Sequence, residues 1–236
     1  MPKSFVAGVG MTPFNSPKKS ASLAANPESD YLDLAVEASV KALLDAGITY
    51  DKVDQAIGCY VFGDSTCAQR VFYSLGMTGI PIFNVNNYCS SGSTGLWLAN
   101  QSIRAGDADC VLVTGFDKMY PGPLPQVFKD RTNPLSRILD LSKTQIPKAD
   151  ADKPSPGWTP QLYANAQREY LEKYGQEGAG KEDFAQITAV NRSHGCRNPY
   201  SQLSKAVSAD DVLASPVVSG DITRLQCCPS SVSIHN

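Results

Sequence analysis

The sequence lacks several features that would place it at once in a common class of protein. No apolar run approaches the roughly 20 residues that a membrane-spanning helix needs. The first residues, MPKSFVAGVGMTPF, lack the hydrophobic core of a secretory signal, and the C-terminal SIHN differs from a peroxisomal Ser-Lys-Leu signal. The formal net charge is -2, and there is no basic stripe with interleaved aromatic residues, so we expect no nucleic-acid partner.

Histidine is scarce, and cysteine occurs without a pairing motif. The chain has two histidines and seven cysteines, an odd number, with no CxxC pair. Scattered cysteines of this kind favour a reducing compartment over a disulfide framework. His194 and Cys196 have no second pair at ligand spacing, so we expect no metal site. At 236 residues, the chain is long enough to bury a sizeable core.

The main chemical signal is the stretch PIFNVNNYCSSGSTGLWLANQSIRAG, residues 81–106. Its first part alternates apolar residues with asparagine, which is typical of a strand. Its second part has helical spacing, with Leu96, Ala99 and Ile103 on one expected face. Cys89 is therefore expected where a strand ends and a helix begins.

Two interpretations of Cys89 follow from this position. Free cysteine is among the most buried residue types, so packing in the core is one of them. The other is chemical, because unpaired N–H groups and the helix dipole at a helix N-terminus favour an anion such as a thiolate. The small residues that follow, SSGSTG at 90–95, allow backbone or a substrate to come close. This second interpretation makes Cys89 a candidate nucleophile.

Strand-like and helix-like patterns alternate over the first 119 residues. We expect strands at 4–10, 54–62, 82–86 and 109–116, and helices at 31–46, 65–75 and after Cys89. Asp30 is an expected N-cap, and Gly47, Gly76 and Gly106 are expected to end the helices. The alternation predicts an α/β fold: a mostly parallel sheet with helices on both faces. Ligand sites in such sheets lie beyond the C-terminal ends of the strands, where Cys89 is expected.

The pattern changes after Lys118. The next 40 or so residues are rich in proline, and helical patterns then occur at 135–141, 159–175 and 181–192, with Ser208 as a further cap. We therefore expect three regions. They are an αβα core at 1–119, a helical insertion at 120–217, and the start of a returning core strand with a divergent tail at 218–236.

The motif Asn87-Tyr88-Cys89-Ser90, followed by Gly92-Ser93-Thr94, resembles the thiolase family. The similarity is greatest to the thiolases that are fused or related to sterol carrier proteins. Further matching motifs follow in family order: GFDKM at 115–119, DRTNP at 130–134, NPYSQ at 198–202 and ITRLQCCP at 222–229. The resemblance thus extends over nearly the whole chain.

This resemblance implies an acyl-CoA C-acyltransferase that cleaves 3-ketoacyl-CoA with a second CoA, or runs the reverse condensation. Cys89 matches the cysteine that attacks the keto carbon and carries the acyl group as a thioester. The resemblance implies no cofactor, with coenzyme A as a substrate, and a helical loop domain that helps bind it. It also implies a homodimer formed through the strand from Ile82 to Asn86. The implied location is the peroxisome, with the cytoplasm as the alternative because no C-terminal signal is present.

The resemblance stops after Ser231. The family continues there with a second half, which carries the activating histidine and another acid–base group, and we expect this chain to lack it. Neither histidine lies in a matching motif: His194 is expected on the surface of the insertion, and we assign no role to His235. Two alternatives remain, a thiolase chain with the nucleophile and half the site, or a non-catalytic form that acts by pairing with another thiolase chain. The family motifs argue against a third, a ketoacyl synthase.

Overall fold

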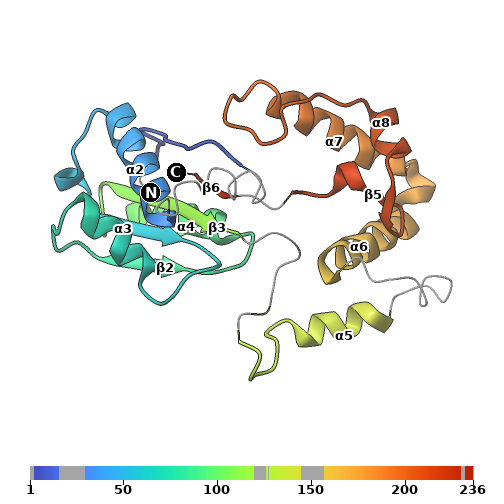
Figure 1. Ribbon diagram of the computed structural model, residues 1–236, viewed down its shortest axis with the longest axis horizontal. Helices are drawn as coiled ribbons and strands as arrows, with labels where there is room; N and C mark the ends of the chain where they lie inside the picture. The colour runs from blue at the N-terminus through green and yellow to red at the C-terminus, as the bar shows by residue number, and fades with distance from the viewer. Residues whose placement is uncertain are drawn as a thin grey trace. The chain divides into compact units, whose positions relative to one another are not determined.

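The computed structural model describes residues 3–15, 30–119, 126, 128–144, 157–229 and 232–235. The chain forms two compact units, Met1–Pro121 with Ser230–Asn236, and Gly122–Pro229 (Figure 1). Residues 218–229, which the sequence analysis grouped with the returning core, lie in the second unit.

A four-stranded sheet in the order β2-β1-β3-β6 forms the centre of the first unit. Strands β1 (Gln55–Cys59), β2 (Ile82–Val85) and β3 (Val111–Lys118) are parallel, and β6 (Val232–His235) pairs antiparallel with β3. Every residue of the central strand β1 is buried, as expected for a parallel strand that helices cover on both faces. The predicted α/β class with a mostly parallel sheet is confirmed.

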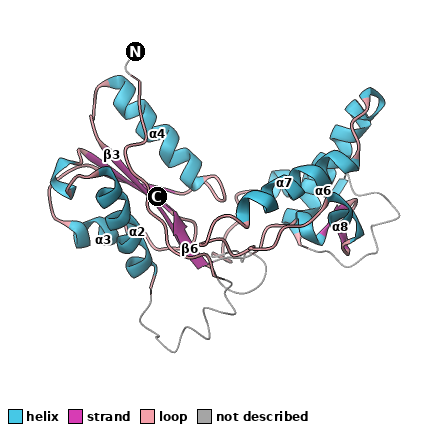
Figure 2. Cartoon of the chain, turned by 90° about the horizontal axis from the view of Figure 1, so that it is seen from above, coloured by secondary structure: helices cyan, strands magenta, loops and turns pink. Residues whose placement is uncertain are grey.

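Helices cover both faces of this sheet. Helices α2 (Tyr31–Ala46) and α3 (Cys67–Leu75), with the short η1 (Tyr50–Lys52), lie on one face, and α4 (Ser91–Ala105) lies on the other (Figure 2). The predicted caps are present at both ends of α2. Asp30 forms a capping box, and Gly47 adopts the left-handed conformation with a φ of 69°. Gly106 ends α4 in the same way, with a φ of 82°.

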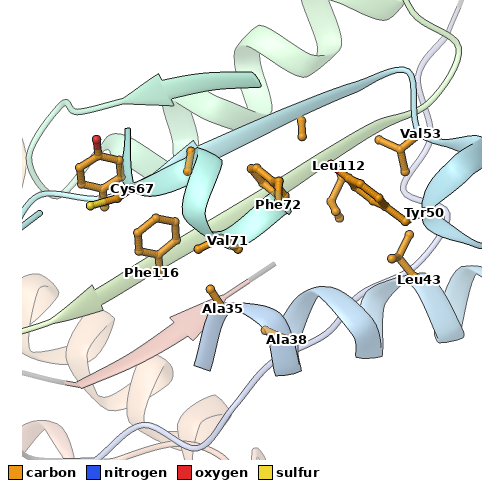
Figure 3. Packing of buried hydrophobic residues seen from close by; sticks show 13 residues of the cluster. Ala35, Ala38, Leu43, Tyr50, Val53, Cys67, Val71, Phe72, Leu112 and Phe116 are labelled. Atoms are coloured by element: carbon orange, nitrogen blue, oxygen red, sulfur yellow. The ribbon is translucent and has the colours of Figure 1, made fainter. Parts of the chain in front are cut away.

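The face under α2 and α3 holds the larger core (Figure 3). Val71 and Phe72 of α3 are fully buried there against Leu112 and Phe116 of β3. The Phe116 ring stacks on Tyr31 and on Tyr60, each at a centroid distance of 5.2 Å. This packing fixes the sheet as a rigid platform, at whose C-terminal edge the Cys89 turn begins.

The buried face of α4 differs from the predicted one. Leu96, expected beside Ala99, is 60% exposed, whereas Ser91, Gly95 and Ala99 are buried against the sheet. Small side chains at these positions let α4 approach the strands closely. The prediction is confirmed for Ala99 and wrong for Leu96, because it followed the largest apolar residue, while the buried positions are held by small ones.

The predicted N-terminal strand at 4–10 is not formed. These residues instead cross α2, where a side chain at Gly8 or Gly10 would overlap the helix backbone. The Val9 backbone N–H donates to Asp45 Oδ2 at 2.9 Å, and Ser4 Oγ donates to Asn100 Oδ1 at 2.7 Å. Two polar groups of the segment thus bond to helix side chains, and the two glycines allow the close crossing.

The second unit is mainly helical in its described residues. It contains α5 (Ser136–Thr144), α6 (Trp158–Tyr174), η3 (Gly175–Glu177), α7 (Lys181–Gly195), α8 (Ala209–Ala214) and η4 (Arg224–Gln226). Strands β4 (Val217–Ser219) and β5 (Ile222–Thr223) pair antiparallel with each other, and no described strand of this unit joins the four-stranded sheet. Asn165 of α6 ties down α5, because its buried Nδ2 donates to Ser142 O at 3.0 Å.

Candidate functional site

Cys89 lies in the short turn, residues 86–90, that joins β2 to α4. Tyr88 has a φ of 48°, a left-handed conformation that reverses the chain immediately before the cysteine. The Ser90 N–H then donates to Asn87 O at 3.1 Å, and the Ser91 N–H donates to Tyr88 O at 3.0 Å. Cys89 is exposed, two residues before the first residue of α4. The predicted position, after a strand and at a helix N-terminus, is confirmed.

Hydroxyl and amide side chains brace this turn. Ser91 Oγ accepts from the Asn87 backbone N–H at 2.8 Å and lies 2.7 Å from Tyr88 O. Asn87 Nδ2 donates to Thr94 Oγ1 at 3.0 Å, and Thr94 Oγ1 donates to Ser90 O at 2.8 Å. From the sequence, the small residues were expected to leave space for a substrate. Their role in holding the turn by hydrogen bonds was not predicted. Their high density of hydroxyl and amide groups around one cysteine was the available signal.

The turn also contacts the segment that follows β1. The Tyr60 N–H donates to Val85 O at 3.1 Å, which continues the pairing of β1 with β2. Beyond that point, Asn86 Nδ2 donates to Val61 O at 3.3 Å, and Ser91 Oγ lies 3.4 Å from Tyr60 O. The Cys89 turn therefore lies at the C-terminal ends of adjacent parallel strands, the usual place for a ligand site in such a sheet.

Asp117 holds the same segment from the side of β3. Its two carboxylate oxygens accept from the backbone N–H groups of Val61 and Phe62, each at 3.1 Å. Burial raises the pKa of the Asp117 carboxyl above its usual value, and the two backbone donors partly oppose that rise. In the sequence, Asp117 stands out only as part of the GFDKM motif, which assigns it no role.

The seven cysteines differ in their surroundings, although all are free. Cys59 is 2% exposed, and burial raises the pKa of its thiol to about 11, so it is neutral at physiological pH. Cys67 is buried as well, and Cys89, Cys196 and Cys228 are exposed. Among the exposed three, Cys89 alone lies at the turn between a strand of the parallel sheet and a helix N-terminus. The interpretation of Cys89 as a core residue is therefore wrong.

The hydrogen bonds that hold the turn are made by hydroxyl, amide and backbone groups. His194 is exposed on α7 in the second unit, and the backbone of His235 pairs with Gly115 in the β3–β6 ladder. The described residues contain no group of histidine, cysteine and carboxylate side chains able to hold a metal ion. None of the described helices has the length and apolar character that a membrane span requires. An exposed thiol at this position is a candidate nucleophile, and the chemistry that suits it is attack on a carbonyl carbon.

Comparison with known proteins identifies a matching family and several similar sequences. The family described as "Thiolase, N-terminal domain" matches residues 4–151. Sterol carrier protein 2 of Gallus gallus is 48% identical over 228 residues, which are 96% of this chain and 39% of that protein. The non-specific lipid-transfer protein-like 2 of Caenorhabditis elegans is 38% identical over 233 residues, 98% of this chain and 53% of that protein.

A solved structure shares the fold. The Ltp2-ChsH2(DUF35) aldolase superimposes with a TM-score of 0.68 at 23% identity, over 97% of this chain and 53% of that chain. The present chain thus spans about two-fifths of the length of sterol carrier protein 2 and about half that of the other two proteins.

Proposed function

This chain belongs to the thiolase family, and we propose that it is a thiolase-type acyltransferase in lipid metabolism that uses Cys89 to form an acyl thioester. The observation that most supports the proposal is the placement of an exposed Cys89 on a braced turn before α4, at the C-terminal ends of β1 and β2. The sterol carrier and lipid-transfer names of the relatives support the lipid-related class.

The proposed substrate is a 3-ketoacyl-CoA. The Cys89 thiolate attacks the C3 carbonyl carbon, the C2–C3 bond breaks, and the acyl group stays on sulfur as a thioester. The departing carbon takes up a proton to give acetyl-CoA. The thiol of a second CoA then attacks the thioester, which releases the shortened acyl-CoA and restores Cys89. Coenzyme A is a substrate in this scheme, and we propose no separate cofactor.

Two features of the family are carried over as proposals. The first is a homodimer through Ile82 to Asn86. It is supported by the position of β2 at an edge of the sheet and by Phe83, which is 48% exposed on that strand. The second is a peroxisomal location, with a cytoplasmic one as the alternative.

A second candidate is a non-catalytic chain that acts by pairing with another thiolase chain. It is favoured by the amide and hydroxyl groups that brace the Cys89 turn, because none of them is a general acid or base at neutral pH. It is also favoured by Leu96 and Trp97 of α4, each 60% exposed, which offer an apolar surface to a partner.

The two candidates are separated by following acylation and turnover in one protein. The full chain is incubated with acetoacetyl-CoA, and peptide mapping locates acetyl groups, with Cys89→Ala as the control. Thiolysis of the same compound is then assayed with added CoA. We expect an acetyl group on Cys89 that Cys89→Ala abolishes, with little turnover, because the side chains that hold the Cys89 turn are amides and hydroxyls, and a general acid or base typically contributes roughly 10²–10⁴-fold in rate.

Each other result has a definite meaning. Turnover that Cys89→Ala abolishes would show that the chain is a working enzyme on its own. Absence of both acylation and turnover in a folded protein would rule out the nucleophile role and leave the pairing function. Acetylation at another cysteine would show that the nucleophile is misassigned.

A further inference from the structure

We propose that Asp117 is a positioning residue for the Cys89 turn, acting through the backbone of residues 60–62. Its carboxylate bonds the backbone of Val61 and Phe62, and its effect passes through Asn86 and Ser91. The inference deepens the proposed function, on which it rests, because it takes Cys89 as the group whose position matters.

The first link joins β3 to the segment after β1. The β1–β3 ladder ends at the pair Cys59 and Gly115, so the N–H groups of Val61 and Phe62, which follow β1, need other acceptors. Asp117 provides both, with Oδ2 accepting from Val61 and Oδ1 from Phe62, each at 3.1 Å. A carboxylate suits this task because it offers an acceptor oxygen to each N–H and carries no donor of its own.

The second link joins that segment to the Cys89 turn. Val61 O accepts from Asn86 Nδ2 at 3.3 Å, and Tyr60 O lies 3.4 Å from Ser91 Oγ. The same Ser91 Oγ accepts from the Asn87 N–H at 2.8 Å, inside the turn. Residues 60–62 are thus bonded on two sides. The Asp117 carboxylate accepts from their N–H groups, and Asn86 and Ser91 of the turn contact their carbonyl oxygens.

The geometry makes the ionised carboxylate essential to the link. In Asp117→Asn, the amide keeps one acceptor oxygen and presents an NH₂ group to the second backbone N–H. One of the two N–H groups then loses its partner, and residues 61 and 62 are free to shift. Because the Asn86 bond follows Val61 O, such a shift reaches the turn that carries Cys89.

The experiment measures iodoacetamide labelling of the full chain cysteine by cysteine, in wild type and in Asp117→Asn. We expect the Cys89 rate to fall roughly two- to fivefold, the size of effect that a helix N-terminus has on a nearby anion. Cys59 and Cys67 are 2% and 4% exposed and report general opening of the fold, so they should stay protected. Asp64→Asn is the matched control, since it makes the same change at an exposed aspartate in the loop whose backbone Asp117 bonds. Its labelling should equal that of wild type.

A second variant keeps the test decisive if Asp117→Asn is destabilised. Asn86 is exposed, so Asn86→Ala should fold normally. The substitution removes the bond from Asn86 Nδ2 to Val61 O, which joins residues 60–62 to the Cys89 turn. It should slow Cys89 labelling by a similar factor, and the double variant should be no slower than either single one. Unchanged Cys89 labelling in Asn86→Ala, or additive effects in the double variant, would overturn the proposal.

Labelling requires no acyl-CoA and no turnover. A chain that shows these rates but never forms an acetyl thioester would refute the proposed reaction and leave the role of Asp117 in place. A chain that is acetylated at Cys89 with the same rate in Asp117→Asn and wild type would support the reaction and refute the role of Asp117.

Discussion

The Sγ atom of Cys59 fills the space that a side chain at Gly95 would need. A methyl group built on Gly95 would overlap this sulfur atom and would lie 3.0 Å from Val113 Cγ1. The absence of a side chain in the first half of α4 therefore sets how closely the helix lies on β1 and β3. The Cys89 turn immediately precedes this contact, so its position depends on the same packing.

Gly95→Ala should destabilise the first unit despite the better helix propensity of alanine. Overpacking of this kind typically costs about 1–3 kcal/mol, whereas the propensity gain is at most about 1 kcal/mol. Urea unfolding measures the difference. Gly92→Ala is the matched control on the same helix, because a methyl group there meets nothing within 4 Å. That variant should be as stable as wild type or more so, and a stable Gly95→Ala would contradict the packing argument.

The buried thiol of Cys59 predicts a loss of stability at alkaline pH. Its pKa is raised from 9.0 to about 11 in the folded chain, so the folded state keeps a proton that the unfolded state loses between these values. Stability therefore falls as pH rises from 9 towards 11, by at most about 2.7 kcal/mol for a shift of this size. Unfolding free energies at several pH values, compared with those of Cys59→Ala, isolate the contribution. A difference between the two proteins that does not change with pH would refute it.

The burial of Asp117 predicts a second pH dependence of the folding stability, in the acid range. Burial raises the pKa of its carboxyl above the 3.8 of the unfolded chain, so the folded state binds the proton more tightly. The Asp117 carboxyl therefore contributes most to the free energy of unfolding below pH 3.8. This contribution declines as the pH rises through the pKa that the group has in the folded chain. The stability of wild type relative to Asp117→Asn should fall over this window. The opposite slope would mean that the two backbone donors outweigh desolvation.

Local chemistry made the helix ends and the position of Cys89 predictable. Asp30, Gly47 and Gly106 act as caps through bonds made within one turn of chain, so their identity in the sequence suffices. A strand was also expected at 54–62, where β1 lies, and its residues 56–59 are the kind of short apolar run that a strand buried on both faces has.

Features that depend on contacts between distant segments were not predictable in the same way. The apolar pattern at 4–10 is compatible with a strand, and its crossing over α2 depends on the small residues Ala38 and Ala42 of that helix. The role of Asp117 depends on two N–H groups more than 50 residues away in sequence. Nothing within a local window indicates such a partner.

The exposed apolar surface of α4 predicts self-association. Leu96 and Trp97 are adjacent, each 60% exposed, and large apolar side chains grouped on a helix favour burial against a partner. We expect sedimentation at micromolar concentration to show oligomers, and Leu96→Glu to shift the distribution towards monomer. The substitution should not harm the fold, because the position is exposed and a negative charge is tolerated in the N-terminal half of a helix. Leu44→Glu is the matched control, since Leu44 is 73% exposed on α2, on the opposite face of the sheet. A monodisperse wild-type monomer, or equal effects of the two substitutions, would show that α4 is not the associating surface.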